Sequence, residues 1–293
     1  NYGNFAAMVT ITPDCFKQTL YNLVILISVF SIGLLFSFKS ANACISVIRG
    51  EPVQGGLILF DSKKATKIKL DSKLISLNQE NGFVVGFHRD DQAVRIITGI
   101  CQDGSPFSLE LKPTRRNYKI QKIDQLPNKM VTPPENTLNR ISIESKMVKE
   151  ARSIKGNSTE YFRNGFDWPL TGIITGVYGS QRILNGKSRQ PHFGIDIAAP
   201  AGTPVTASAS GHVVMVENLY FSGWTIIISH GDYISSTYSH LQTISVQKGE
   251  NINRGEKIGT VGSTGRSTGA HLDWRINWLD KRLDPELIAN IKE

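Results

Sequence analysis

The sequence predicts a mainly β protein in which two β-rich parts are joined by a helix. Short runs of apolar and β-branched residues, punctuated by Gly, Asn and Asp, recur from residue 44 to residue 127 and again after Phe166. Such runs with turn residues between them are typical of small β-sandwiches and barrels. Apolar residues at helical spacing occur between these two parts, so a linker helix is expected there.

Residues 1–43 are predicted to be a signal peptide or an N-terminal anchor. Lys17 precedes the apolar run Leu23–Phe36, and Ala41-Asn42-Ala43 follows it. The run is shorter than the ~20 residues that cross a bilayer as a helix, which favours a signal peptide cleaved after Ala43. The protein would then be exported to the periplasm or cell envelope. An uncleaved anchor would be its one contact with the membrane.

Cysteine content and charge narrow the chemistry. The three cysteines, Cys15, Cys44 and Cys101, form no Cys-x-x-Cys pair, so a thiolate zinc site is not expected. Export would permit a Cys44–Cys101 disulfide. A lipid on Cys44 is disfavoured, because the three preceding residues lack the apolar side chain expected there.

The net charge of +8 alone fits nucleic acid or an anionic polymer. Because the basic residues are scattered, we expect no nucleic acid partner.

The first β-rich part is expected to span residues 44–127. Turn-forming pairs such as Asn81-Gly82 and Asp103-Gly104 separate its β-prone runs. His88 follows one run and has no metal-binding partner nearby in the sequence, so it is interpreted as a loop residue. The predicted strands are Leu57–Phe60, Phe83–Phe87, Ala93–Ile97 and Phe107–Leu111.

Residues 128–160 are predicted to form a linker with one amphipathic helix. Prolines 133 and 134 end the strand pattern, and Asn136 or Asn139 is the expected helix cap. The helix either serves regulation or packs on the second part as ordinary core cover, and the pattern leaves both interpretations open. The apolar positions at helical spacing are Ile143, Met147, Ala151 and Ile154.

Residues 161–293 are predicted to form an all-β domain, with no helix of useful length before Pro285. Glycines stand at most junctions between its β-prone runs. The predicted strands are Gly172–Tyr178, Thr203–Ala207, His212–Val216, Trp224–Ile228, Ser235–Tyr238 and Lys257–Gly262, together with the two described next.

Three segments of this domain combine an apolar face with a face of metal-binding or proton-transferring groups. In the run from Pro191 to Pro200, His192 and Asp196 alternate with apolar residues, and Gly194 between them is expected to leave the space above open. Imidazole and carboxylate groups are ligands of zinc-type sites. One such segment is weak evidence, because a bare short motif often has no function.

The second segment places Tyr238 and His240 on one predicted face, and the third does the same for His271, Asp273 and Arg275. Three such segments in one domain favour a functional site. Arg275 is expected either to be solvated or to bind a carboxylate-rich peptide. Two further histidines in this domain, His212 and His230, share a strand face with no second ligand and are interpreted as structural.

These segments resemble the lysostaphin/LytM family of zinc metalloendopeptidases that cut peptidoglycan cross-bridges. The resemblance runs in order from Phe166 to Pro285, which is far more than a single motif. It implies a small β-sheet domain with an open groove, and it implies export. The matching segments are Trp168-Pro169, Gly172–Gly179, His192–Asp196, Ala199–Val205, His230-Gly231, Tyr238–Leu241, Gly255–Gly259, Gly262–Leu272 and Asp284-Pro285.

The resemblance also implies roles for individual residues. His192 and Asp196 match the first two zinc ligands, and His240 and His271 match the two catalytic histidines that do not bind the metal. The third ligand is normally the second histidine of a His-x-His pair, but Asp273 stands there. A second carboxylate would make a bound water less acidic. It would also make Mn²⁺ and other oxygen-preferring ions more competitive with Zn²⁺.

The predicted function is therefore that of an exported metalloendopeptidase with one Zn²⁺ or other divalent ion, acting on peptide cross-links or stem peptides of peptidoglycan. The alternative is a non-catalytic module that binds peptidoglycan or activates a partner cell-wall hydrolase. Retention of both His240 and His271 argues for the enzyme, since a binding module needs neither group.

Overall fold

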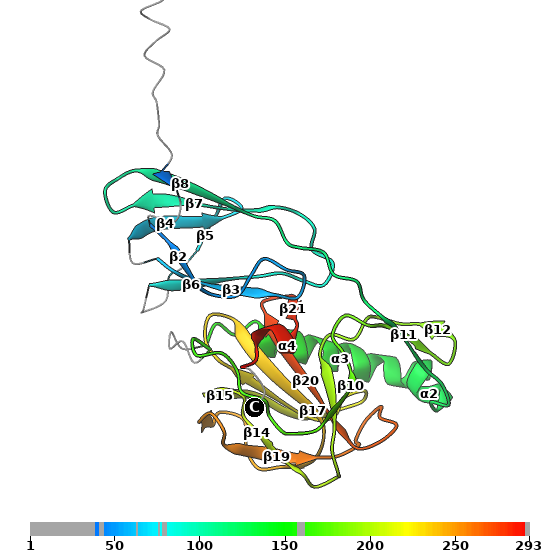
Figure 1. Ribbon diagram of the computed structural model, residues 1–293. Helices are drawn as coiled ribbons and strands as arrows, with labels where there is room; N and C mark the ends of the chain where they lie inside the picture. Colours follow the sequence, from blue (N-terminus) through cyan, green and yellow to red (C-terminus); the bar gives the residue numbers. More distant parts are fainter. Residues whose placement is uncertain are drawn as a thin grey trace, which may run out of the picture. The chain divides into compact units, whose positions relative to one another are not determined.

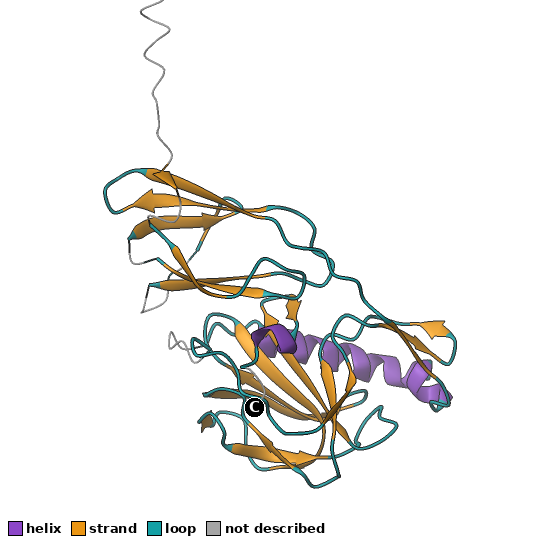
Figure 2. Ribbon diagram, viewed as in Figure 1, coloured by secondary structure: helices purple, strands orange, loops and turns teal. Residues whose placement is uncertain are grey.

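The computed structural model describes residues 39–40, 44–62, 64–75, 77, 81–156 and 162–290. Apart from Lys39 and Ser40, the predicted signal peptide or anchor, with Lys17, Leu23–Phe36 and Ala41-Asn42-Ala43, lies outside the described residues. None of the helices in the described ranges is long and apolar enough to cross a membrane. Strands dominate these ranges, as Figure 2 shows, which confirms the mainly β prediction.

The N-terminal β-rich part consists of two small sheets (Figure 1). One has the strand order β1-β8-β7-β4-β5 and the other β2-β3-β6. Phe60 and Phe83 stack with ring centroids 4.8 Å apart, and both belong to the same buried core as Ile97 and Phe107 of the larger sheet. The two sheets therefore share a core, as in a sandwich. The strands are β1 (Lys39–Ser40), β2 (Ser46–Arg49), β3 (Leu57–Asp61), β4 (Ala65–Leu70), β5 (Lys73–Leu74), β6 (Gly82–Gly86), β7 (Arg95–Cys101) and β8 (Pro106–Leu111).

The four strands predicted for this part correspond to β3, β6, β7 and β8, whereas β1, β2, β4 and β5 were not predicted. Cys44 and Cys101 form the disulfide that export would permit, with their Cα atoms 5.4 Å apart. The bond joins residues 57 positions apart in the chain, so it removes much of the freedom of the unfolded chain. It also engages the Cys44 thiol, which is then not available for a lipid.

The C-terminal β-rich part is built on one ten-stranded sheet. Its main path runs β10-β13-β20-β17-β16-β15-β18, while β19 pairs with β17 and β14, and β21 pairs with β20. Ile195, Tyr238 and Trp274 are fully buried in its core. The elements are β10 (Ile173–Gly176), β13 (Ile195–Ala198), β14 (Pro204–Thr206), β15 (Gly211–Leu219), β16 (Gly223–Ser229), β17 (Ile234–Ile244), β18 (Asn251–Ile252), β19 (Lys257–Val261), β20 (His271–Trp278), β21 (Lys281–Leu283) and the short helix α4 (Pro285–Ile288).

A third small sheet has the order β12-β11-β9. Strands β11 (Gln181–Leu184) and β12 (Lys187–Ser188) form a hairpin around Asn185-Gly186, whose positive φ values of 47° and 77° suit a tight turn. Strand β9 (Ile120–Ile123) pairs in parallel with β11. Because β9 precedes residue 127, this backbone pairing crosses the predicted boundary of the first part. The domain boundaries themselves remain a prediction.

Two helices follow β9, namely α2 (Asn128–Val131) and α3 (Glu135–Arg152). The predicted cap was wrong: Pro134 is at the N-cap position, without a side-chain hydrogen bond, and both candidate asparagines lie inside α3. The predicted apolar stripe was partly wrong, because Ile143 is exposed and Ile154 lies beyond the helix end. The helix packs through Ala151 and the half-buried Val148 against β15 and β16, which is the core-cover arrangement.

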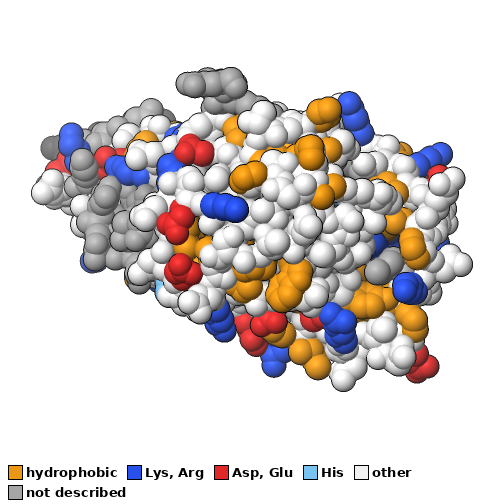
Figure 3. All heavy atoms as spheres, turned by 90° about the horizontal axis from the view of Figure 1, so that it is seen from below, with side chains coloured by type: hydrophobic (Ala, Val, Ile, Leu, Met, Phe, Trp, Pro, Cys, Tyr) orange, Lys and Arg blue, Asp and Glu red, His pale blue; other side chains and the backbone are white. Residues whose placement is uncertain are grey.

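Ion pairs connect the two β-rich parts. Arg116 Nη1 lies 2.6 Å from Asp284 Oδ2, and the Asp284 side chain is fully buried. Lys281 Nζ of β21 lies 2.9 Å from Asp91 Oδ2 in the first part. On the face shown in Figure 3, basic, acidic and apolar side chains are interspersed.

Candidate active site

Strands β13 and β20 bring two acidic residues together. The antiparallel register sets Asp196 directly opposite Asp273, so both side chains lie on the same face of the sheet. Two carboxylates in this arrangement repel each other unless cations compensate them. His192 lies just before β13, which begins at Ile195 rather than at His192 as the alternation suggested. Its Nε2 is 3.0 Å from Asp196 Oδ1.

His192, Asp196 and Asp273 form a group whose candidate donor atoms all lie within 4.8 Å of one another. All three are buried, with exposed fractions of 1%, 7% and 2%. Nδ1 of His192 is buried without a hydrogen-bond partner, and Nε2 of His192 and Oδ1 of Asp196 are buried with only each other nearby, 3.0 Å apart but without hydrogen-bond geometry. Buried polar atoms are rarely left unsatisfied, so these orphaned atoms fit a bound cation. Within the described ranges, this is the one His, Cys, Asp and Glu group with such spacing.

The space next to Gly194 is filled rather than open. A Cβ atom added there would lie 2.5 Å from Arg275 Cγ and 3.0 Å from Asp273 Oδ1. The expectation of free space above this glycine was therefore wrong. A side chain at position 194 would displace Asp273 or the Arg275 that contacts it, so glycine is needed for this close approach.

Arg275 holds Asp273 through both carboxylate oxygens. Its Nε donates to Asp273 Oδ1 at 2.8 Å, and its Nη2 donates to Oδ2. Burial alone would raise the pKa of Asp273, but the Arg275 guanidinium outweighs burial and holds that pKa below its usual range. Each carboxylate oxygen has a second lone pair, so Asp273 can still bind a cation. The sequence-based expectation for Arg275, solvation or peptide binding, did not include this pair.

His240 reaches the site through an irregularity in β17. Tyr238 lies opposite Trp274 in the core, so alternation would also turn His240 toward the core. The backbone of His240 instead has a φ of 65°, and the pairing of β17 with β16 and β19 shifts register nearby. This local change turns His240 to the site while Tyr238 stays in the core. The prediction of one shared face for the two was wrong.

His240 and His271 lie side by side, with ring centroids 4.7 Å apart. Nδ1 of His240 is 2.7 Å from Thr264 O, and Nδ1 of His271 is 2.8 Å from Gly269 O. A carbonyl can only accept, so each Nδ1 carries the proton when the ring is neutral, and each Nε2 is left as a proton acceptor. Burial lowers the pKa of His240 to about 4, which keeps that ring neutral at pH 7.

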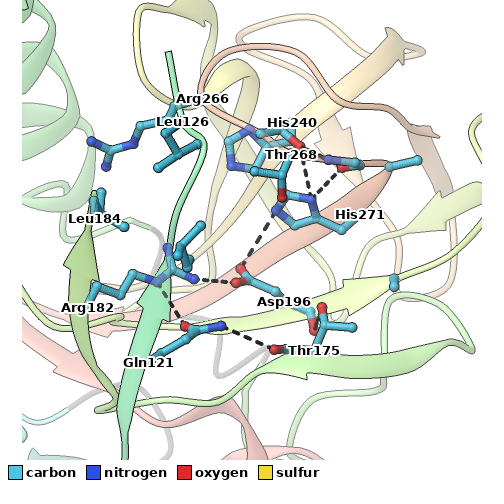
Figure 4. A pocket seen from close by; sticks show the side chains of 15 residues that line it. Gln121, Leu126, Thr175, Arg182, Leu184, Asp196, His240, Arg266, Thr268 and His271 are labelled. Carbon is cyan, nitrogen blue, oxygen red and sulfur yellow. Dashed lines mark hydrogen bonds and ion pairs between the residues drawn. The ribbon is translucent and has the colours of Figure 1, made fainter. Parts of the chain in front are cut away.

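Two adjoining cavities open beside these groups. Asp196, His240 and His271 line the first, of about 320 Å³, and His192 lines the second, of about 520 Å³. Arg182, Leu184 and Arg266 line both. The structure thus brings together all five predicted site residues, while their chemical roles remain a prediction. Figure 4 shows the first cavity.

Sequence analysis missed the residues that β9 and β11 contribute. Arg182 Nη2 donates to Asp196 Oδ2, and Arg182 Nε donates to Gln121 Oε1 at 3.3 Å. Gln121 Nε2 in turn donates to Thr175 O at 3.4 Å (Figure 4). The Asn-Gly pair after Leu184 was an available hairpin signal that would have placed Arg182 on a strand.

The other histidines lie outside the metal-binding group, in agreement with their interpretation as structural or loop residues. His230 is fully buried, with Nδ1 2.7 Å from Ser210 O and Nε2 2.7 Å from Ser236 Oγ. His212 is partly exposed and contacts Asn251 Oδ1 at 3.0 Å. His88 stacks at an angle near Phe193, with ring centroids 5.2 Å apart.

Residues 190–285 match peptidase family M23. This span contains all five site residues. The chain carries a C-terminal M23 domain. The sequence resemblance to the LytM-type peptidases is thereby confirmed.

Two relatives that match the M23 domain carry the names of peptidases. The chain is 45% identical over 86 residues to the peptidoglycan DD-endopeptidase ShyA of Vibrio cholerae, a match covering 29% of this chain and 20% of ShyA. It is 42% identical over 98 residues to the DD-carboxypeptidase/endopeptidase Mpg of Neisseria meningitidis, covering 33% of this chain and 23% of Mpg. The chain thus matches less than a quarter of the length of these relatives.

A crystal structure from Pseudomonas aeruginosa, assigned to peptidase M23, resembles most of the chain. The TM-score is 0.62 at 25% sequence identity, and the match covers 82% of this chain and 96% of the other. Because it extends well beyond the 190–285 span, the similarity includes residues outside the M23 domain.

Proposed function

We propose that the protein is an exported metalloendopeptidase that hydrolyses peptide cross-links or stem peptides of peptidoglycan. The observation that carries this proposal is the group His192, Asp196 and Asp273, with orphaned buried donor atoms, beside His240 and His271. The M23 match and the names of the relatives support the substrate class.

In this proposal His192, Asp196 and Asp273 hold one divalent cation, Zn²⁺ or a harder ion. Such an ion, when bound, supplies a Lewis acid that activates water and polarises a carbonyl group. The Nε2 atoms of His240 and His271 are the proton-transferring atoms in this proposal, and Nε2 of His271 lies 4.0 Å from Asp196 Oδ1. One ring would accept the proton of the attacking water, and the other, after taking a proton from solvent on Nε2, would donate a hydrogen bond to the oxyanion of the substrate.

Arg275 offsets the extra charge that Asp273 brings to the ligand set. Two carboxylates and one divalent cation sum to zero, whereas a set with one carboxylate would keep one positive charge. The guanidinium bound to Asp273 restores that positive charge and weakens the carboxylate as an electron donor. The substitution of aspartate at the expected histidine position is therefore compatible with an active site.

Export is supported by the Cys44–Cys101 disulfide, because disulfides persist mainly in oxidising compartments. N-terminal sequencing of the exported protein tests this part of the proposal. A mature chain beginning at Cys44 is expected, and a full-length soluble chain in the cytoplasm would contradict it.

The experiment that tests the activity is digestion of purified sacculi by the mature protein, followed by analysis of the released fragments. Cleaved cross-links are expected without chelator and intact ones with it. Asp273→Ala is expected to lose metal and activity, and Asp273→Asn to lower metal affinity. Asp273→His is expected to retain metal with a stronger preference for Zn²⁺, because imidazole is the softer ligand.

The second candidate is a non-catalytic module that binds peptidoglycan or activates a partner hydrolase. One observation favours it: both site carboxylates already have arginine partners, Arg182 for Asp196 and Arg275 for Asp273. In this case the purified protein would hold no metal under any condition and would leave sacculi intact.

A further inference from the structure

The three residues of the proposed metal site differ in how their backbones are held. Asp196 on β13 and Asp273 on β20 lie directly opposite each other in paired strands. His192 instead lies in the connection between β12, which ends at Ser188, and β13, which begins at Ile195. Connecting segments are generally more mobile than paired strands. The position of His192 must therefore come from contacts outside the ten-stranded sheet.

The dipeptide Gly179-Ser180 holds the backbone of His192 from both sides. The Gly179 N–H donates to His192 O at 2.7 Å, and the His192 N–H donates to Ser180 O at 2.8 Å. The His192 side chain is fully buried, and its Nδ1 has no hydrogen-bond partner among the described residues. A shift of the dipeptide would therefore move the His192 ring with it.

Two residues that precede the M23 match hold this dipeptide in turn. Arg89 Nε donates to Gly179 O at 2.6 Å. The Tyr118 ring fills the space beside Gly179, where an added Cβ atom would lie 2.1 Å from Tyr118 Cδ1. Gly179 also has a φ of 79°, so a residue without a side chain is needed there for both reasons. Both contacts come from residues well before position 190, where the M23 match begins.

Arg89 and Tyr118 also stabilise each other. Arg89 Cζ lies 4.3 Å from the centroid of the Tyr118 ring, and the Tyr118 hydroxyl donates to Arg89 O at 3.3 Å. The Arg89 side chain is only 15% exposed, and a cation over an aromatic ring is held more strongly where water is excluded. The tilted contact between His88 and Phe193 joins the same two segments next to His192.

We infer that Arg89 and Tyr118 are positioning residues for the metal ligand His192, so that residues outside the M23 match set the affinity for the cation. They act through Gly179 and Ser180 and touch neither the cation nor the substrate. The inference rests on the proposed metal binding by His192, Asp196 and Asp273. It goes beyond that proposal, whose ligands and proton-transferring groups all lie inside the M23 match.

The test measures metal affinity rather than cleavage. After chelator treatment, Zn²⁺ is titrated into the mature protein and into Arg89→Leu in competition with a chelating dye. Loss of a group that orients a metal ligand costs about 10–100-fold in affinity, so Arg89→Leu is expected to bind Zn²⁺ about tenfold more weakly. Arg89→Lys keeps a charged donor for Gly179 O and is expected to restore most of the affinity. Unchanged affinity in Arg89→Leu would overturn the inference.

Arg95→Leu is the matched control. Arg95 lies in the same β-rich part, its side chain is 19% exposed, and it pairs with Asp71 of that part. This variant is expected to bind Zn²⁺ as the parent does. An equal loss of affinity in Arg95→Leu and Arg89→Leu would indicate general destabilisation and overturn the inference. Tyr118→Ala removes the ring beside Gly179 and is expected to weaken Zn²⁺ binding even if Arg89→Leu fails to fold.

Amide hydrogen exchange in the metal-free protein locates the effect. The N–H groups of Gly179 and His192 are expected to exchange about tenfold faster in Arg89→Leu than in the parent, because their mutual hydrogen bonds open more often. No such change is expected in Arg95→Leu. A loss of Zn²⁺ affinity without faster exchange at these two positions would mean that Arg89 acts by another route, and would overturn the inference.

Three outcomes separate this inference from the proposed function. A parent that binds Zn²⁺ with an affinity dependent on Arg89, but leaves sacculi intact, would refute the proposed hydrolysis and leave the inference standing. Cleavage by the parent, together with unchanged Zn²⁺ affinity in Arg89→Leu and Tyr118→Ala, would do the reverse. A parent that binds no ion would contradict both.

Discussion

Replacing Arg275 with leucine is expected to destabilise the metal-free protein by about 3 kcal/mol. Asp273 is 2% exposed, lies opposite Asp196, and has both oxygens bonded to Arg275. Removing one partner of a buried ion pair costs about 3–5 kcal/mol, because the remaining charge is left uncompensated. We take the lower end of this range, because 26% of the Arg275 side chain is exposed.

The assay is urea unfolding at pH 7 in the presence of chelator, with the free energy of unfolding as the readout. Arg275→Leu combined with Asp273→Asn is expected to be more stable than Arg275→Leu alone by about 2 kcal/mol, since the stranded charge is gone. Lys146→Leu is the control: its partner is Glu150 on the surface of α3, where both side chains are exposed, and the expected cost is below about 1 kcal/mol. A loss below about 1 kcal/mol for Arg275→Leu, with no rescue, would refute the reasoning.

The pH dependence has a defined sign. In the parent, the folded-state pKa of Asp273 lies below its ordinary value of 3.8, so its stabilising contribution is present above pH 3.8 and is lost as the pH falls below it. In Arg275→Leu, burial is expected to raise the pKa of Asp273 above 3.8. The cost of burying the uncompensated Asp273 charge then disappears as the pH falls and the carboxyl becomes protonated. The difference in stability between Arg275→Leu and the parent is therefore expected to narrow as the pH is lowered toward 3.8.

Three other outcomes follow from the structure. His240→Ala and His271→Ala are each expected to reduce hydrolysis of sacculi by ~10²–10⁴-fold with metal content nearly unchanged, and loss of metal would show that ligand and catalyst are assigned wrongly. Replacing Cys44 and Cys101 with serine is expected to lower the free energy of unfolding by about 4 kcal/mol, measured in urea, and an unchanged value would contradict the constraint on the unfolded chain. Burial lowers the pKa of His230 to about 4 from 6.5, so stability present above pH 6.5 is lost as the pH falls toward 4. The loss in the free energy of unfolding between pH 6.5 and pH 4, up to ~3 kcal/mol, is expected to be smaller in His230→Gln than in the parent. If the two proteins lose the same amount, groups other than His230 cause the pH dependence.

The sequence predicted elements with strong local signals. Strands such as β3, β6 and β16 are rich in apolar and β-branched residues, so their presence followed from composition and turn residues. Strands β9 and β11 carry Gln, Lys and Arg beside isoleucine, and a pairing partner decides their structure. Local pattern alone does not specify such strands, which is why the Arg182 and Gln121 contributions to the site were missed.

In the candidate site, the sequence predicted which residues take part but not how strand pairing orients their side chains. His192, Asp196, His240, His271 and Asp273 were found from their residue types and motif, but their orientation depended on pairing. One residue with positive φ turned His240 away from the face predicted by alternation. The helix cap was misplaced because two asparagines gave a side-chain signal, whereas the prolines before α3 determine where it begins.

The central claim is that His192, Asp196 and Asp273 together hold a divalent cation, and a metal-binding titration of the mature protein tests it most directly. After chelator treatment, Zn²⁺ and Mn²⁺ are titrated into the parent, into Asp273→Ala, and into Asp280→Ala, which removes an exposed carboxylate that is not part of the group. One ion per chain is expected for the parent and for Asp280→Ala, with strongly reduced affinity for Asp273→Ala. A parent that binds no ion, or an Asp273→Ala variant that binds as well as the parent, would contradict the claim.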